Sequence, residues 1–157
     1  MRAHRLLDAS GATVATAESL TGGRLAALLT AAPGASRTYV GGVVAYATEV
    51  KIRTLGVTVE LLAREGVVSG ACALAMAEGA RRVLDSTHAL STTGVAGPDL
   101  QEGLPVGTVF VGIAGPRGAT AHAFQLTGSR AQIQDGACAA ALDILVTLLR
   151  EEESGVG

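Results

Sequence analysis

Aromatic residues are scarce in this sequence: they make up 3% of its 157 positions, and tryptophan is absent. Apolar residues nevertheless make up 48% of the chain, so the core has to be built mainly from alanine, valine and leucine. Such small side chains suit helices that lie close against a sheet. Because a chain of this length can bury a sizeable core, we expect one domain over residues 1–157, with its core in residues 12–150 and a flexible tail at residues 151–157.

Runs of basic residues and clusters of basic with aromatic side chains are also missing. The 12 lysines and arginines are scattered among 14 acidic residues, which gives a net charge of −2. We therefore expect no nucleic acid as a partner, since that binding depends on neutralising phosphates. No stretch reaches about 20 apolar residues, and the N-terminus has no apolar signal core. We therefore expect no membrane partner and a cytoplasmic location.

Cysteine is rare, and the usual signatures of metal and nucleotide sites are absent. Cys72 and Cys138 both lie in alanine-rich helical patterns, and we expect buried thiols in a reducing compartment rather than a disulfide. No spacing of histidine, cysteine and acidic residues fits a zinc or EF-hand site. Walker A and GxGxxG motifs are missing as well. We expect neither a metal nor a cofactor.

Hydrophobic patterning predicts an alternation of strands and helices. Strands are expected at residues 12–16, 39–46, 88–92, 106–113 and 119–126. Helices are expected at residues 23–31, 59–65, 69–84 and from 129 onward, with shorter helical segments at 1–10 and after 46.

This order of elements favours an α/β fold, a three-layer α/β/α sandwich with a mixed sheet of about five strands. The strand at residues 39–46 is apolar nearly throughout, so we expect it to be buried on both faces. The last two strands are separated by a glycine- and proline-containing turn and read as a β-hairpin. That hairpin predicts an antiparallel edge in a sheet that is otherwise parallel.

The turn at residues 16–23, TAESLTGG, is the strongest candidate for an active site. A buried strand ends at Ser19, and the glycines Gly22 and Gly23 permit a tight reversal before a helical pattern begins. A serine there would lie beside the unpaired N–H groups of a helix N-terminus, which can bind a phosphate or an oxyanion. The alternative is that Ser19 or Thr21 merely caps the helix, the commoner role of serine at such a junction.

Lys51 is the only lysine in the chain, and it follows Tyr46 by five residues at a second passage from strand to helix. In parallel sheets ligands gather beyond the carboxyl ends of strands, where Ser19, Tyr46 and Gly94 would all lie. A partly desolvated lysine can accept the proton of a serine, and a tyrosine can relay or position that proton. The alternative is that Lys51 is an exposed helix charge.

A Ser-His-Asp triad fits this sequence poorly. None of the histidines, His4, His88 and His122, occupies a loop between a strand and a following helix. Histidine-dependent activation of Ser19 is therefore not expected, which leaves lysine as the candidate base.

Several ordered motifs resemble those of the CinA C-terminal domain family. They are residues 16–23, Tyr46 followed by Lys51, and residues 93–98, 105–109 and 128–130, within a similarity that extends from about residue 13 to residue 149. Members of that family are nicotinamide-nucleotide amidohydrolases, which convert nicotinamide mononucleotide to nicotinic acid mononucleotide and ammonia in pyridine-nucleotide salvage. The resemblance implies a three-layer α/β/α fold, a small-molecule nucleotide substrate and no metal. It also implies that Ser19 is the nucleophile, Lys51 the general base and Tyr46 an assisting residue.

The remaining candidate residues are expected to bind the substrate. We expect the amides of Thr21, Gly22 and Gly23 and the loop at Thr93 and Gly94 to hold the oxyanion or the phosphate. Arg130 is expected to contribute charge toward the phosphate, and an ordinary surface arginine is an equal alternative. An alanine-rich chain with few aromatics can also gain core by pairing helices between subunits, so we expect a homo-oligomer.

The chain departs from the family pattern at four positions. Ala47 and Thr48 stand where the family usually has Ser-Asn, Leu104 where a lysine is frequent, and Gln134 where a second arginine is common. These departures leave open an altered substrate, or a paralogue that binds nucleotides and plays a regulatory role without efficient catalysis. A further alternative is a domain that acts only as an assembly module, in which Ser19 is a helix cap and Lys51 is solvated.

Overall fold

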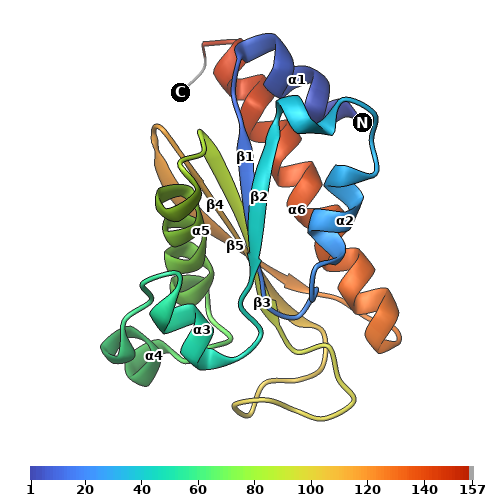
Figure 1. Cartoon of the computed structure of the whole chain (residues 1–157). Coiled ribbons are helices and arrows are strands. Elements are labelled where there is room, and N and C mark those ends of the chain that lie inside the picture. Colours follow the sequence, from blue (N-terminus) through green and yellow to red (C-terminus); the bar gives the residue numbers. More distant parts are fainter. Residues whose placement is uncertain (156–157) are drawn as a thin grey trace.

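The computed structural model describes residues 1–155 of the chain. In chain order its elements are α1 (Arg2–Ser10), β1 (Val14–Glu18), α2 (Arg24–Thr30), the 3₁₀ turn η1 (Ala35–Arg37), β2 (Tyr39–Val44), α3 (Thr48–Arg53), α4 (Val59–Glu65), α5 (Gly70–Leu84), β3 (His88–Gly94), β4 (Thr108–Gly115), β5 (Gly118–Gln125) and α6 (Arg130–Glu153). One sheet lies between α1, α2 and α6 on one face and α3, α4 and α5 on the other (Figure 1). The predicted three-layer α/β/α fold is confirmed.

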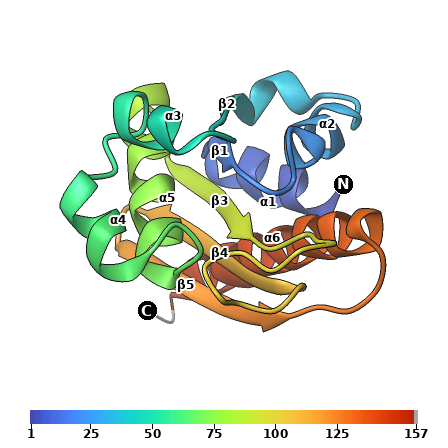
Figure 2. The same cartoon turned by 90° about the horizontal axis from the view of Figure 1, so that it is seen from below.

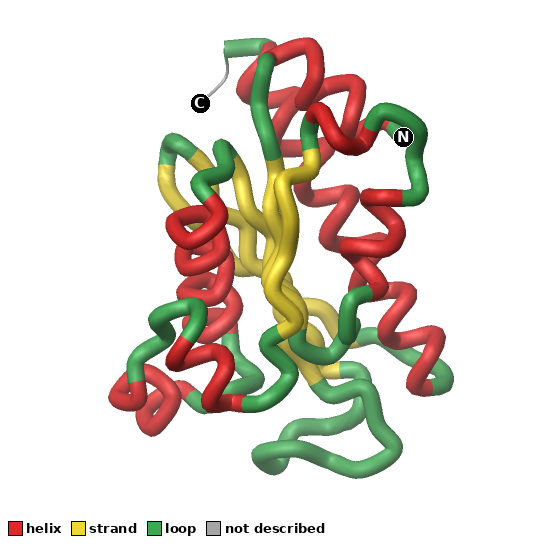
Figure 3. Tube along the Cα trace, viewed as in Figure 1, coloured by secondary structure: helices red, strands yellow, loops and turns green. Residues whose placement is uncertain are grey.

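The sheet has five strands in the order β2-β1-β3-β4-β5. β1 is parallel to both β2 and β3, whereas β4 is antiparallel to β3 and to β5. The β4–β5 hairpin therefore forms the predicted antiparallel edge of a mixed sheet. The carboxyl ends of the three parallel strands point to the same end of the molecule, where the long loop between β3 and β4 also lies (Figure 3).

Strand β2 is not buried on both faces as its sequence predicted. It is the edge strand beside β1, and its side chains alternate between half-buried and exposed positions. Val40 and Val44 are 47% and 48% exposed. The prediction was wrong because an apolar run looks the same in an edge strand and in a central strand, and only the order of the strands distinguishes them.

Two separate cores form because successive side chains of a strand point to opposite faces of the sheet. Val14 packs with α1, α2 and α6, whereas Ala15 and Ala17 pack with α5 and the segment after α3. Cys72 lies in one core and Cys138 in the other, and both are free thiols. The prediction that they do not form a disulfide is confirmed.

Helix α5 approaches its neighbours closely at two glycines. A Cβ atom on Gly79 would lie 2.1 Å from the carbonyl oxygen of Leu55, and one on Gly112 of β4 would lie 2.3 Å from the carbonyl oxygen of Ala73. Real Cβ atoms do not come so close to backbone, so only glycine permits this spacing. Small residues at these contacts thus allow the helix to pack closely on the sheet.

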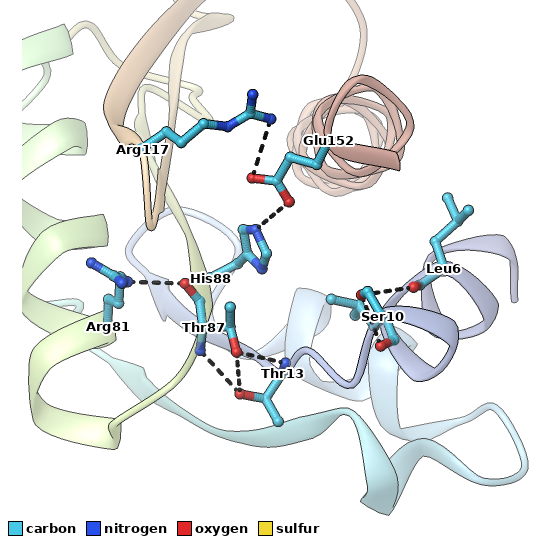
Figure 4. Close-up of polar contacts among 9 residues, drawn as sticks. Leu6, Ser10, Thr13, Arg81, Thr87, His88, Arg117 and Glu152 are labelled. Carbon is cyan, nitrogen blue, oxygen red and sulfur yellow. Dashed lines mark hydrogen bonds and ion pairs between the residues drawn. The ribbon is translucent and has the colours of Figure 1, made fainter. Parts of the chain in front are cut away.

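Helix α6 extends to Glu153, three residues into the segment predicted to be a flexible tail. The carboxylate of Glu152 contacts Nε2 of His88 at 3.0 Å and the guanidinium of Arg117 at 3.7 Å, which ties the end of α6 to the sheet (Figure 4). Residues 156 and 157 of the predicted tail lie outside the described residues. Within residues 1–155, α6 is the one helix long and apolar enough to span a membrane, a test that core helices of soluble domains also pass.

Candidate active site

A cavity of about 430 Å³ opens at the carboxyl ends of the parallel strands. Its walls come from the end of β3 and the loops that follow β1, β2 and β3, from α3, from the connection between α4 and α5, and from the first residue of α6. The view from this end shows these segments converging from distant parts of the sequence (Figure 2). The candidate residues at the cavity are Ser19, Tyr46, Lys51, Thr93, Gly94 and Arg130.

Ser19 follows β1 directly and continues the sheet by one hydrogen bond, from its amide to the carbonyl of Thr92 at 2.9 Å. Its side chain does not cap α2, because the N-cap of that helix is Gly23 and, within residues 1–155, the Ser19 hydroxyl accepts no hydrogen bond from the amides of its first turn. The residue is 9% exposed. The hydroxyl of Ser19 instead accepts a hydrogen bond from the amine of Lys51 at 3.0 Å. The cap alternative for Ser19 therefore does not hold.

Lys51 is buried, with only 1% of its surface exposed, so it is not a solvated helix charge. Its Nζ atom contacts three oxygens: the carbonyls of Ala45 at 2.7 Å and Tyr46 at 3.1 Å, and the hydroxyl of Ser19. Burial lowers the pKa of the Lys51 amine below its ordinary value of 10.5, because the charged form loses its hydration. When Lys51 is neutral, the two carbonyls can hold its two N–H groups and leave the lone pair directed at Ser19.

The N-terminus of α2 is occupied by a side chain that the sequence did not single out. Glu18 is 1% exposed, and its carboxylate accepts hydrogen bonds from the amides of Leu25 at 2.8 Å and Ala26 at 3.1 Å. The hydroxyl of Thr21 also donates to Glu18, at 2.6 Å. These amides are therefore not available to a phosphate. No capping signal in the sequence marks Glu18, because it lies at the end of β1, five positions before the N-cap Gly23.

The structure does not bring Thr21, Gly22 and Gly23 to the cavity. The chain turns away after Leu20, with φ of 55° at Gly22 and 102° at Gly23, and the hydroxyl of Thr21 points to Glu18 in the interior. The amide of Gly22 donates to the carbonyl of Ser19 at 3.1 Å. The next residue after Ser19, Leu20, lines the cavity, and its amide donates no hydrogen bond to any residue in 1–155.

Tyr46 and Arg130 meet at the edge of the cavity. Arg130 donates to the hydroxyl of Tyr46 at 3.2 Å and to the carbonyl of Gly97 at 2.6 Å. The Tyr46 side chain is largely exposed, and within residues 1–155 its hydroxyl bonds to Arg130 and to neither Ser19 nor Lys51. The contact of Tyr46 with Lys51 is made by its backbone carbonyl. Arg130 is thus a cavity residue and not an arginine remote from the site.

Three of the four positions that depart from the family pattern lie near the site. Thr48 lines the cavity at the start of α3. Ala47 is the N-cap of α3 and offers no side-chain cap. The side-chain amide of Gln134 donates to the carbonyl of Leu20 at 2.8 Å, so it supports the peptide that follows the serine. Leu104 pairs with Gln101 in a short bridge of the loop between β3 and β4.

The histidines lie away from the cavity. His4 bonds to Thr38 and to the carbonyl of Leu29, His88 bonds to Glu152, and His122 lies on β5. Within residues 1–155 no group of three histidine, cysteine or acidic side chains could hold a metal ion. No histidine among the described residues lines the cavity, and its polar lining residues are Ser19, Tyr46, Thr48, Lys51, Thr93, Asp99, Gln101 and Arg130.

Comparison with known proteins gives concordant results at the level of sequence and of structure. The family model of the CinA C-terminal domain matches residues 1–149. A CinA-like protein of Frankia casuarinae is 51% identical over 144 residues, which cover 92% of this chain and 33% of that protein. A CinA-like protein of Anaeromyxobacter is 48% identical over 145 residues, 92% of this chain and 36% of that protein. The chain thus spans about a third of the length of these relatives.

Solved structures give the same result. A competence-damaged protein (CinA) superfamily protein of Klebsiella pneumoniae superimposes with a TM-score of 0.93 at 34% identity, covering 96% of this chain and 94% of that one. The competence/damage inducible protein CihA of Agrobacterium tumefaciens gives a TM-score of 0.88 at 34% identity, covering 94% and 93%.

Proposed function

This chain belongs to the CinA C-terminal domain family, and we propose that it is an amidohydrolase that converts nicotinamide mononucleotide to nicotinic acid mononucleotide and ammonia. The observation that carries the proposal is the 3.0 Å hydrogen bond between Nζ of Lys51 and Oγ of Ser19. A buried amine with a lowered pKa beside a serine hydroxyl is the arrangement that Ser-Lys hydrolysis of an amide requires. The proposed role is in pyridine-nucleotide salvage in the cytoplasm.

In the first half of the proposed reaction, neutral Lys51 takes the proton of the Ser19 hydroxyl while Oγ attacks the carboxamide carbon. The carbonyl oxygen becomes an oxyanion, for which the amide of Leu20 is the candidate donor. The tetrahedral intermediate then collapses. The C–N bond breaks, and the leaving nitrogen takes the proton back from Lys51 and departs as ammonia. The product is an ester between the nicotinoyl carbon and Ser19.

In the second half, a water molecule attacks that ester carbon and gives a proton to Lys51. The bond to Oγ breaks, and Lys51 returns its proton to Ser19 as the carboxylic acid leaves. Every proton is moved by the one amine, so neither a metal nor a cofactor enters these steps. The exposed guanidinium of Arg130, fixed at the cavity between Tyr46 and Gly97, is the proposed partner of the substrate phosphate.

A second candidate function is a nucleotide-binding paralogue with a regulatory role. It is favoured by Gln134, whose side chain is engaged with the carbonyl of Leu20 where the family commonly has an arginine. Loss of a cationic ligand contact would weaken productive binding without removing the cavity.

An ammonia-coupled assay across pyridine mononucleotides and dinucleotides separates the two candidates. We expect ammonia from nicotinamide mononucleotide with the wild-type protein, and a decrease in kcat of about 10³-fold or more for Ser19→Ala, as for other essential nucleophiles. Ser10→Ala, which removes an exposed helical hydroxyl, is the matched control. Calorimetric binding of the nucleotide with no ammonia formed would select the paralogue, and full turnover by Ser19→Ala would exclude serine as the nucleophile.

A further inference from the structure

The loop between β3 and β4 folds back along the cavity, and we call its residues 96–104 the flap. Residues 96–101 line the cavity, and the chain then reverses at Glu102 and Gly103. Gln101 and Leu104 pair across this reversal, with a hydrogen bond from the amide of Leu104 to the carbonyl of Gln101 at 2.9 Å. The flap therefore ends in a two-residue hairpin turn.

Glu102 occupies a backbone conformation that glutamate rarely adopts. Its φ is 52°, followed by 73° at Gly103. A turn with positive φ at both central residues favours asparagine or glycine at the first of them, and a glutamate there carries a cost of order 1 kcal/mol. Such a conformation persists only where other contacts hold it in place.

The contacts that hold it are made by the carboxylate of Glu102. One oxygen accepts from the amide of Val68 at 2.8 Å, and the other accepts from the amide of Val67 at 3.1 Å. Both valines line the cavity, in the connection between α4 and α5. Hydrogen bonds from backbone amides to a charged carboxylate are stronger than those between neutral groups. Glu102 thus joins two walls of the cavity that are distant in sequence.

Two other side chains fasten the same walls. The hydroxyl of Thr93 donates to the carbonyl of Val67 at 2.9 Å, so this peptide segment is held from both sides. Arg130 donates to the carbonyl of Gly97 near the start of the flap. Glu102 itself does not line the cavity and makes no hydrogen bond to Ser19 or Lys51. Glu102 therefore acts on the site indirectly, by holding the flap in position.

We propose that Glu102 is a positioning residue whose carboxylate fastens the flap to the amides of Val67 and Val68, and thereby sets the affinity of the cavity for its nucleotide substrate. The effect on catalysis rests on the proposed amidohydrolase function. Because Glu102 does not touch the reacting atoms, its removal loosens substrate binding and leaves the Ser19–Lys51 chemistry intact. KM rises, and kcat is nearly unchanged.

The test uses Glu102→Gly with Asp85→Gly as its matched control. Glycine fits the turn at position 102 and removes the backbone strain, so only the carboxylate fastening is lost. Asp85 also has a positive φ, 49°, at the C-terminal cap of α5, and it lies outside this cavity. Both variants exchange an acidic residue at positive φ for glycine. Only Glu102→Gly also removes the hydrogen bonds from the amides of Val67 and Val68.

For Glu102→Gly we expect amide hydrogen exchange at Val67 and Val68 to accelerate about tenfold or more. We also expect KM for nicotinamide mononucleotide to rise about tenfold, with kcat within about twofold of the wild type. Asp85→Gly should change none of these values. Glu102→Gln, which keeps the length of the side chain but turns an N–H toward one amide, should fall between the wild type and Glu102→Gly.

If the exchange rates of the Val67 and Val68 amides are unchanged in Glu102→Gly, the carboxylate does not hold the flap in place. If exchange is faster but KM is unchanged, the flap is held by Glu102 but does not set the substrate affinity. A kcat that falls as far as in Ser19→Ala would also contradict the positioning role. If the wild-type protein releases no ammonia, the proposed function fails on its own. The exchange measurement, together with calorimetric affinity for the nucleotide, then still decides the role of Glu102.

Discussion

The amine of Lys51 lies 3.0 Å from the hydroxyl of Ser19, although the two residues are 32 positions apart in the chain. Both are buried, and the other partners of the amine are the backbone carbonyls of Ala45 and Tyr46. No carboxylate in residues 1–155 forms an ion pair with it. Without a counter-ion, burial disfavours the ammonium form, which is why the amine is suited to accept a proton.

The rate should therefore depend on pH through Lys51. Since the base has to be neutral, we expect log kcat/KM to rise with unit slope and to level off at the lowered pKa of Lys51, below 10.5. Lys51→Arg, which stays protonated, should be inactive throughout the same pH range. If log kcat/KM of the wild-type protein does not change with pH below the lowered pKa of Lys51, Lys51 is not the base.

Stability should change with pH for the same reason. Between the lowered pKa of Lys51 in the folded state and 10.5 in the unfolded state, the unfolded chain binds more protons at this residue. The contribution of Lys51 to the free energy of unfolding therefore rises with pH in that window and is constant below it. Urea unfolding should show the difference between wild type and Lys51→Met increasing in favour of the wild type from the lower to the upper end of the window.

Replacing Arg130 should weaken substrate binding more than it slows the chemistry. Its guanidinium bonds to Tyr46 and Gly97 at the cavity, where it can meet a phosphate. We expect Arg130→Gln to raise KM for nicotinamide mononucleotide about tenfold, the cost of one charged hydrogen bond, with a smaller change in kcat. The control is Arg24→Gln, because Arg24 pairs with Asp135 at 2.8 Å and does not line the cavity. Equal KM values for the two variants would contradict the assignment.

Glu18 should stabilise the fold at the start of α2. In Glu18→Gln, the side-chain N–H group would face the amides of Leu25 and Ala26 or the hydroxyl of Thr21, all of which donate to the carboxylate. We expect a loss of about 1–3 kcal/mol in the free energy of unfolding, measured with urea. Glu60→Gln, in the first turn of α4, is the comparison, and its effect should stay within about 0.5 kcal/mol. A similar loss in both variants would assign the effect to charge alone.

The close approach of α5 to Leu55 should make Gly79 sensitive to any side chain. Its added Cβ would lie 2.1 Å from a backbone oxygen, so either the helix or the segment after α3 has to move. We expect Gly79→Ala to lower the free energy of unfolding by about 1–3 kcal/mol, despite the better helix propensity of alanine. Gly103→Ala is a useful contrast in thermal unfolding, because its Cβ would meet no atom within 4 Å and only its positive φ opposes the change.

Local pattern was sufficient for the fold class. The alternation of strands and helices and the terminal hairpin can be read from hydrophobic period and turn residues, because these signals depend on neighbours within a few positions. The ordered motifs also marked Ser19, Tyr46, Lys51 and the loop at Thr93 as parts of one site. Those residues come from the carboxyl ends of parallel strands, which share one end of any such sheet.

Tertiary packing alone decided the rest. It placed β2 at an edge, buried Lys51 and turned residues 21–23 away from the cavity. It also brought the carboxylate of Glu18 to the first amides of α2, and that of Glu102 to the amides of Val67 and Val68. Each of these depends on contacts between segments whose separation in sequence carries no periodic signal. The sequence by itself thus determined which side chains could do the chemistry, and the three-dimensional arrangement determined which of them face one another and which are desolvated.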